Sequence, residues 1–150
     1  MTEPDELYYW IQVCSTQLRR RANAALTEVV DLTATQLGAL FIIHEQQACL
    51  LKELAEALHV NGSAITTLAS RLEQRKLVVR ERSPEDGRAY QLTLTDAGRN
   101  AVERAKPRLK AMNYWLREGF TPDELAVVLR FLTTTVERAA SPLALGDSHE

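Results

Sequence analysis

The residues of this sequence best suited to molecular recognition lie between positions 63 and 88. Short hydroxyl and small side chains come first, at Ser63, Ala64, Thr66, Thr67 and Ser70. Arginines follow at Arg71, Arg80, Arg82 and Arg88. A guanidinium is always charged and carries planar donors that match phosphates and base edges. Small side chains at a helix start let the backbone approach such groups. The chemistry that this combination favours is recognition of an anionic surface.

The distribution of charge is compatible with that chemistry, although the total is not. The net charge of the chain is −2. Residues 1–60 carry −4, residues 61–110 carry +5 and residues 111–150 carry −3. A basic middle between acidic ends indicates a nucleic-acid surface. A solvated helical surface is the alternative, because nearly half of the basic side chains in residues 61–110 lie beyond residue 98.

Residues that could support catalysis or metal binding do not form a recognisable group. Cys14 and Cys49 have neither a metal-ligand nor a CxxC spacing. His44 and His59 have no carboxylate or thiol at ligand spacing. There is also no nucleophile–base pair, carboxylate pair or glycine-rich phosphate loop. We therefore predict that the protein is not an enzyme and uses neither a cofactor nor a metal.

The composition is that of a globular protein, with 45% hydrophobic and 25% charged residues. A chain of 150 residues predicts one domain, or one domain with a helical arm. No apolar run approaches the roughly 20 residues needed to cross a bilayer, and the start is acidic where a signal peptide is basic. We expect a cytoplasmic protein without a membrane partner.

Apolar periodicity and capping residues predict six helices and two strands. The helices are expected at 5–30, 34–46, 50–58, 62–75, from Thr95 to about 118, and from Thr121 onward. The strands are expected at 77–82 and 89–94. Thr33, Thr95 and Thr121 are candidate N-caps, and Glu124 completes a capping box with Thr121.

The order of these elements predicts a winged helix. Apolar residues hold two short helices together: Leu54, Ala55, Leu58, Val60, Ile65, Leu68 and Leu72. The hydroxyl face of the second helix stays free, as in a helix-turn-helix. A hairpin follows, in which Tyr90, Leu92 and Leu94 form the packed side and "SPEDGR" the turn, with Gly87 able to adopt positive φ. Arg88 at its tip can enter a minor groove.

The last predicted helix carries a continuous apolar stripe of Leu125, Val128, Leu129, Leu132 and Val136. The stripe could pack on its own chain or on a second copy. We favour the second copy, because most oligomers are two-fold homodimers and one helix pair cannot cover three apolar faces. We therefore predict a homodimer.

The stretches "LTATQLGAL", "LKELAEAL" and "SAITTLASRLEQRKLVVRERSPEDGRAYQLTLTDAG" resemble the MarR family of bacterial transcription regulators. The family signature is matched by Asp86, Arg88, Leu92, Leu94, Thr95 and Gly98. The resemblance implies a homodimer that binds double-stranded DNA at a pseudo-palindromic operator, usually as a repressor. The 62–75 helix would enter the major groove, Arg88 would enter the minor groove, and Asp86 would orient the wing by pairing with an arginine.

The sequence departs from the family pattern inside the recognition helix. Many members have an arginine where this chain has Thr67. Its loss removes a guanine contact worth about 1–3 kcal/mol of base discrimination, so a different operator or more weight on shape and phosphate contacts is expected. A winged-helix dimer that binds proteins instead of DNA is the alternative function. Arg71 has two alternatives, a DNA contact or an ion pair between the helix and the wing.

The family usually responds to small phenolic or lipophilic ligands or to oxidants. The resemblance places an effector pocket between the arms and the DNA-binding lobe, where the candidate lining residues are Cys14, Leu18, Leu40, Phe41 and His44. Cys14 could also be a redox switch, which makes a cysteine-based sensor an alternative. It lies on the apolar stripe of its helix, so we predict that Cys14, like Cys49, is buried and structural.

Together these observations predict a mainly α fold with a small β-hairpin wing. Residues 1–150 form a single MarR-like domain. Within it, residues 33–97 form the winged helix-turn-helix lobe, residues 5–30 and 98–139 form the helical dimerisation region, and residues 141–150 form a flexible tail.

Overall fold

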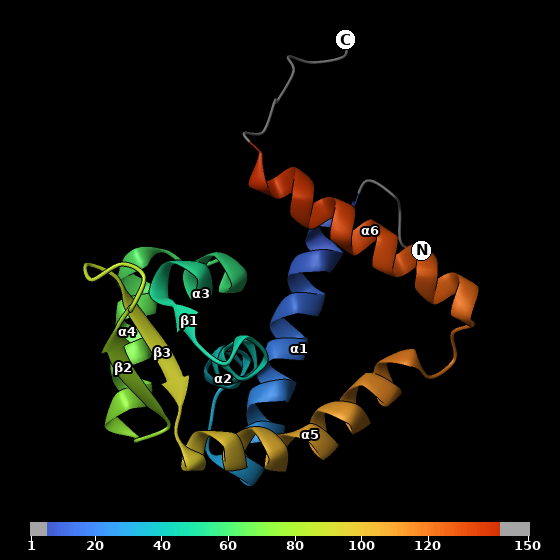
Figure 1. The fold of residues 1–150 in the computed structure, drawn as a ribbon. Helices are drawn as coiled ribbons and strands as arrows, with labels where there is room; N and C mark the ends of the chain where they lie inside the picture. Colours follow the sequence, from blue (N-terminus) through green and yellow to red (C-terminus); the bar gives the residue numbers. More distant parts are fainter. Residues whose placement is uncertain (1–5, 142–150) are drawn as a thin grey trace. The chain divides into compact units, whose positions relative to one another are not determined.

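The computed structural model of the chain describes residues 6–141 and has the predicted order of elements (Figure 1). The elements are α1 (Leu7–Val30), α2 (Ala34–Gln46), β1 (Cys49–Leu50), α3 (Leu51–Leu58), α4 (Gly62–Gln74), β2 (Val78–Arg82), β3 (Tyr90–Leu94), α5 (Asp96–Arg117) and α6 (Pro122–Ala140). The ends of the predicted elements lie within two residues of these bounds. The mainly helical fold class is confirmed.

The helix starts form where side chains satisfy the first backbone N–H groups. Thr33 accepts a hydrogen bond from Gln36 N at 3.2 Å, and the Gln36 side chain accepts one from Thr33 N at 3.0 Å. Thr121 and Glu124 form the same reciprocal pair at the start of α6. Both capping boxes satisfy donors that have no partner within the helix. The helix boundaries therefore follow from local sequence.

The sheet has three antiparallel strands in the order β1-β3-β2, where the sequence predicted two. The additional strand β1 pairs Cys49 with Leu92 and Leu50 with Gln91. A strand of two residues is too short to show an alternating pattern, which explains why the sequence gave no sign of it. Through β1, the start of α3 is joined to the wing.

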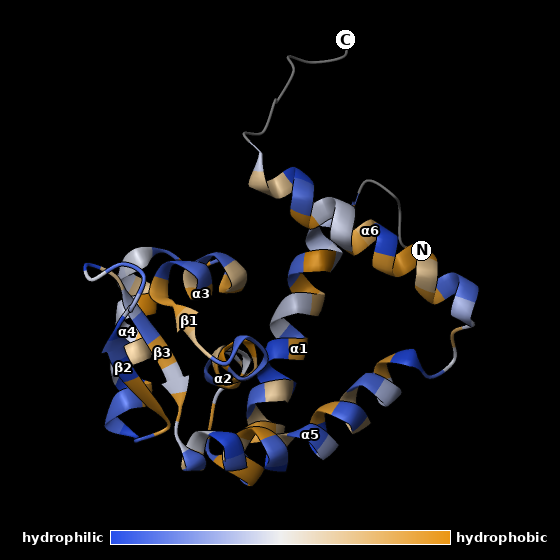
Figure 2. Ribbon diagram, viewed as in Figure 1, coloured by the Kyte–Doolittle hydropathy of each residue, from blue (hydrophilic) through white to orange (hydrophobic). Residues whose placement is uncertain are grey.

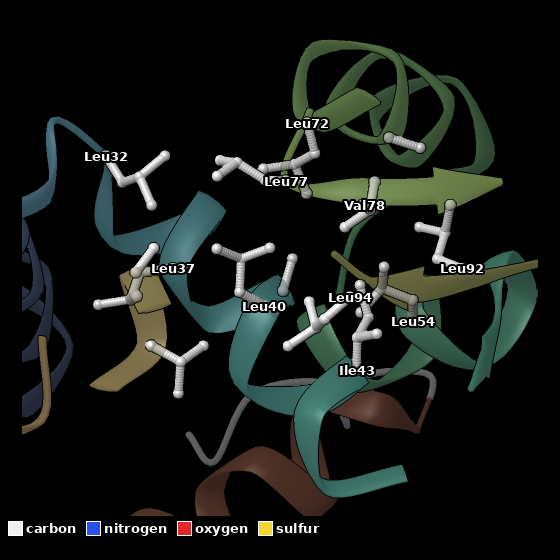
Figure 3. Packing of buried hydrophobic residues seen from close by; sticks show 14 of the residues in the cluster. Leu32, Leu37, Leu40, Ile43, Leu54, Leu72, Leu77, Val78, Leu92 and Leu94 are labelled. Atoms are coloured by element: carbon white, nitrogen blue, oxygen red, sulfur yellow. The ribbon is translucent and has the colours of Figure 1, made fainter. Parts of the chain in front are cut away.

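The core of the protein is built around α2, which lies between α1 and the sheet (Figure 1). Leu37, Leu40 and Ile43 of α2 are at most 1% exposed. They belong to one cluster with Leu72, Leu92 and other buried side chains of α4 and the sheet, and Figure 3 shows part of this cluster. Burying one such side chain stabilises the fold by about 1.5–3 kcal/mol. This core fixes α4 and the wing on one framework.

The chain divides into two compact units, residues 1–110 and residues 111–150, and the division falls within α5. The first unit holds all of the buried core described above. In the second unit, none of the described residues 111–141 is buried. The predicted tail at 141–150 lies outside the described residues, except for Ser141.

No single helix in the described part of the chain is long and apolar enough to cross a membrane, and only α1 and α2 taken together, bent by 68° at their junction, reach that length and hydropathy.

Candidate nucleic-acid interface

The predicted helix-turn-helix is formed by α3 and α4, and Asn61 fixes its turn. The side-chain oxygen of Asn61 accepts hydrogen bonds from Ala64 N at 2.9 Å and from Ser63 Oγ at 2.8 Å. Asn61 thus caps α4 and orients the first hydroxyl of its exposed face. Asn61 was not among the predicted site residues. Its place just before an apolar-periodic segment is the signal that could have identified it.

The helix α4 buries one face and exposes the other, as its sequence pattern predicts. Ile65, Ala69 and Leu72 are at most 3% exposed and lie in the core. On the opposite side, Ser63, Ala64, Thr66 and Thr67 are exposed, and Ser70 is half-buried. The exposed face is therefore free to contact a groove.

The threonine hydroxyls of this face are held by their own helix. Thr66 Oγ1 donates to Gly62 O at 2.9 Å, and Thr67 Oγ1 donates to Ser63 O at 3.1 Å. A hydroxyl has one hydrogen, so each oxygen keeps only its accepting capacity. The methyl groups add apolar surface that suits a thymine methyl. The face thus offers acceptors and methyl groups, and no long donor at its centre.

A groove of about 460 Å³ runs between the starts of α2 and α4. Its lining residues are Thr33, Thr35, Gln36, Val60, Ser63, Ala64, Thr67, Leu68 and Arg71. Two helix N-termini border this groove, and the helix dipole favours negative charge near each of them. The residues of α2 were not predicted as part of the site, because only the tertiary structure brings the start of α2 beside α4.

The two arginines at the end of α4 have different surroundings. Arg71 is exposed and makes no ion pair with any residue in the described part of the chain. The ion pair between helix and wing that was one alternative for Arg71 is therefore not formed. Arg75 instead binds the C-terminal end of α1, through Asp31 O and through Asp31 Oδ2 at 3.1 Å.

Side chains within the wing loop hold its backbone. Ser83 is 7% exposed, and its Oγ accepts from Glu85 N and Asp86 N at 3.3 Å each. Asp86 Oδ1 accepts from Arg88 N at 2.9 Å. The resemblance implied that Asp86 pairs with an arginine side chain, whereas here its carboxylate holds the backbone at the base of Arg88. This Asx-type bond fixes the backbone from which the Arg88 side chain extends.

Gly87 does not have the positive φ that the sequence suggested. A Cβ at this position would meet no heavy atom within 4 Å. The turn does not need a glycine there, because the Ser83 and Asp86 side chains already define the loop. That expectation was wrong.

The three predicted wing arginines differ in what they contact. Arg88 is exposed, and its guanidinium binds no acceptor within residues 6–141. Arg82 donates to Gly87 O at 2.5 Å. The guanidinium carbons of Arg80 and Arg82 lie 4.4 Å and 5.1 Å from the centroid of the Tyr90 ring. Arg88 is therefore the wing arginine available to a partner, while Arg80 and Arg82 are engaged with the wing.

The junction of the wing and α5 explains two residues of the signature. Thr95 Oγ1 donates to Lys76 O at 2.7 Å and accepts from Gly98 N at 3.0 Å, so Thr95 caps α5 as predicted. A Cβ at Gly98 would lie 2.1 Å from Leu77 O. Only glycine lets α5 begin in contact with the strand. The wing and α5 are thus joined closely.

The two cysteines differ, and one prediction about them was wrong. Cys49 is fully buried in β1, and its pKa is raised to about 11, first by burial and second by Glu53. Its thiol is therefore an unreactive core group, as predicted. Cys14 is exposed, because the buried positions of α1 are Ala22, Leu26 and Val30 in its second half.

The five candidate effector residues differ widely in burial. Leu40 is fully buried in the core, whereas Cys14 is exposed. Leu18, Phe41 and His44 are half-buried. His44 borders a small hollow of about 80 Å³ with Gln47, Thr93 and Arg99, which contains none of the other four residues. The assignment of an effector pocket stays a prediction.

The fold and the exposed residues define a class before any relative is considered. A capped helix with a free hydroxyl face, followed by a hairpin with an exposed arginine, is a winged helix-turn-helix. Residues 32–90 match the model of the MarR family.

Two curated relatives cover most of the chain. The HTH-type transcriptional repressor MdtR of Bacillus subtilis is 30% identical over 83% of this chain and 83% of its own. The HTH-type transcriptional regulator SarZ of Staphylococcus haemolyticus is 33% identical over 77% of this chain and 76% of its own. The chain therefore belongs to the MarR family, and it is a DNA-binding transcription regulator.

Solved structures have the same fold. MepR of S. aureus in complex with DNA has a TM-score of 0.80 at 24% identity, covering 86% of this chain and 94% of its own. The PcaV regulator of Streptomyces coelicolor, in complex with its natural ligand, has a TM-score of 0.74 at 25% identity, covering 92% and 94%. These likenesses agree with the winged-helix architecture.

Proposed function

We propose that the protein is a homodimeric repressor that reads a pseudo-palindromic operator, with α4 in the major groove and Arg88 in the minor groove. The observation that carries this proposal is the pairing of two exposed features on one lobe. These are the free face of α4 and a wing arginine whose backbone is fixed by Asp86. Two such lobes would contact half-sites about one helical turn apart.

The chemistry of α4 supports a particular way of reading the major groove. Thr66 and Thr67 offer acceptors and methyl groups, and Ala64 adds a further methyl. Adenine and cytosine present amino donors in the major groove, and thymine presents a methyl group, whereas guanine presents only acceptors. We therefore expect the centre of α4 to face adenine, cytosine or thymine groups. A guanine, which an arginine would recognise, is not expected there.

Contacts to phosphates are expected from the exposed Arg71 and from the groove between α2 and α4. The two helix starts bordering that groove favour an anion. Neutral hydroxyls and N–H groups orient the lobe on the duplex without specifying its sequence. Affinity would then depend strongly on salt, and specificity would depend on α4 and on minor-groove shape.

The homodimer is supported by the apolar surface of α6. Val128, Leu129 and Leu132 are 44%, 62% and 46% exposed. Their stripe appears as orange segments along α6 in Figure 2. Replacing both Leu129 and Leu132 with Glu should raise the dimer dissociation constant by about 100-fold or more, since each leucine contributes about 1.5–3 kcal/mol when buried. Sedimentation at a series of concentrations measures this change.

A small aromatic or lipophilic effector completes the proposal. It is supported by relatives such as PcaV, which was solved with its natural ligand, and BpsR of Bordetella bronchiseptica, whose DNA binding is regulated by 6-hydroxynicotinic acid. The residues that would bind an effector here stay open.

The test is a binding titration on the DNA upstream of the protein's own gene, at several salt concentrations. Log K should fall with log salt by about 0.9 per phosphate neutralised. Arg88→Ala should weaken binding about 10- to 150-fold, the range that corresponds to the loss of a hydrogen bond from a charged group. Arg130→Ala, which removes an exposed arginine of α6, is the matched control and should bind as the wild type does. The proposal would be overturned if the wild-type protein gave no footprint on this DNA and its binding did not depend on salt.

A further inference from the structure

The register of the hairpin places two arginines on the packed face of the sheet. Val78 pairs with Leu94, Arg80 with Leu92, and Arg82 with Tyr90. Paired residues of antiparallel strands point to the same face. That face begins among buried residues, since Val78 is 4% exposed and Leu92 is fully buried. It ends toward the loop at Arg82 and Tyr90, so the two arginines extend the core face toward the tip of the wing.

The Tyr90 ring is the group that both arginines share. The guanidinium carbon of Arg80 lies 4.4 Å from the ring centroid, and that of Arg82 lies 5.1 Å from it. Arg80 Nε is buried and has no hydrogen-bond acceptor within the part of the chain that the structure describes. The negative face of an aromatic ring attracts a cation at these distances. The Tyr90 ring therefore stabilises both guanidinium charges, including that of Arg80, whose Nε has no hydrogen-bond acceptor in the described residues.

The contacts of Arg82 lead from the ring to the tip of the wing. Arg82 donates to Gly87 O at 2.5 Å. Gly87 directly precedes Arg88, whose own N–H is held by Asp86 Oδ1. The backbone on both sides of the Gly87–Arg88 peptide bond is thus fixed, on one side by Arg82 and on the other by Asp86. The ring thus contacts Arg82, and Arg82 in turn contacts the loop carbonyl.

We propose that Tyr90 is a positioning residue for DNA binding, which holds Arg82 against the Gly87 carbonyl and thereby presents Arg88 to the minor groove. Arg82 then acts within the wing, and only Arg88 contacts the groove from its tip. Restricting the loop before binding lowers the ordering cost of the contact. The proposal rests on the proposed function, because its readout is DNA affinity.

The test compares Tyr90→Leu, which removes the ring, with Tyr90→Phe, which keeps it. The DNA affinity of each variant is measured by fluorescence anisotropy on an operator duplex with an A·T-rich flank. Each substitution is tested alone and in combination with Arg88→Ala. Tyr90→Leu should weaken binding about 5- to 10-fold, and Tyr90→Phe should stay within about 2-fold of the wild type. In the Arg88→Ala background, Tyr90→Leu should have less than about a 2-fold effect, because residues that act through one another are not additive.

Three outcomes would overturn the proposal. The first is an equal loss from Tyr90→Leu with and without Arg88. The second is an equal loss from Tyr90→Phe and Tyr90→Leu, which would assign the effect to the hydroxyl. The third is a wild-type rate of amide hydrogen exchange at Arg88 in Tyr90→Leu, since a released loop exchanges faster.

The exchange measurement needs no DNA, so it tests the wing even if the wild type binds no operator. If Tyr90→Leu does not fold, Arg82→Met removes the cation of the same contact and should show the same dependence on Arg88. Full additivity of Arg82→Met with Arg88→Ala would equally overturn the proposal.

Discussion

The first unit (residues 6–110 of the described chain) and the second unit (described residues 111–141) treat their apolar side chains in opposite ways. In the first unit, Leu40, Leu54 and Leu92 are fully buried around α2. In the second, α6 has no buried residue, and Leu129 is 62% exposed. Both units have well-defined helix starts, so the difference does not lie in secondary structure. It lies in what each helix packs against.

This difference indicates which part of the protein depends on association. The first unit holds the α4 face and the wing on a core buried within one chain, although Leu7, Tyr8, Tyr9 and Trp10 at the start of α1 are exposed. The stripe of α6 leaves Val128, Leu129 and Leu132 exposed on one helix, and an exposed apolar surface of this kind favours association. In the proposed function, DNA recognition by the first unit and assembly through α6 are connected by α5, which begins beside Leu77 at Gly98.

The largest expected effect comes from truncating one leucine in each unit. Leu54→Ala should lower the free energy of unfolding by about 2–5 kcal/mol, because it leaves a cavity in a filled core. Leu129→Ala should lower the free energy of unfolding by less than about 0.5 kcal/mol in dilute solution, because truncating an exposed side chain removes few contacts. Urea denaturation at low protein concentration measures both. Equal costs at every concentration would remove the distinction between the units.

The next effect concerns the junction that joins the wing to α5. Gly98→Ala should lower the free energy of unfolding by about 1–3 kcal/mol, because the new Cβ would lie against the Leu77 carbonyl. Gly62→Ala is the control, since a Cβ there meets nothing within 4 Å, and it should raise stability by about 0.4–1 kcal/mol. Thermal melts of both variants provide the measurement. A Gly98→Ala protein as stable as the wild type would contradict the close contact at this junction.

The smallest effect is a pH dependence confined to the start of α6. The pKa of Glu124 is lowered from 4.5, first by the hydrogen bond from the Thr121 backbone and then by that from its hydroxyl. A lowered pKa means that the carboxylate stabilises the helix above its usual pKa and that this stabilisation is lost as pH falls through the lowered pKa.

Glu124→Gln tests that dependence, because an amide does not titrate. The helicity of the wild type should exceed that of the variant slightly at neutral pH, and the difference should disappear as pH falls through the lowered pKa of Glu124. Circular dichroism across the acid range measures it. A difference that persists in acid would mean that the hydrogen bond does not depend on the charge of Glu124.

Much of the fold was predictable because its signals are local. Neighbouring residues alone identify the capping residues Thr33, Thr95 and Thr121 and the apolar periodicity of α4. Each element that was predicted lies within two residues of its observed bounds. The strand β1 was missed, because it exists only through its pairing with β3. Asn61 had a recognisable signal, but it was taken as part of a turn.

The candidate site was predictable in composition and less so in arrangement. The exposure of Arg88 and of the α4 hydroxyls agrees with the sequence pattern. The engagement of Arg80 and Arg82 with Tyr90 does not follow from strand alternation alone, because alternation assigns faces without register. Cys14 was placed on an apolar stripe, yet it lies in the half of α1 that the core does not reach.

The sequence by itself determined the helices, their caps, the free face of α4 and the family signature, because these depend on contacts within a few residues. The tertiary structure decided which arginine of the wing stays free, which cysteine is buried, and that Gly98 must lie against Leu77. The physical reason is that free energies of burial and hydrogen bonding depend on what a side chain meets in space. Residues far apart in the chain supply those neighbours.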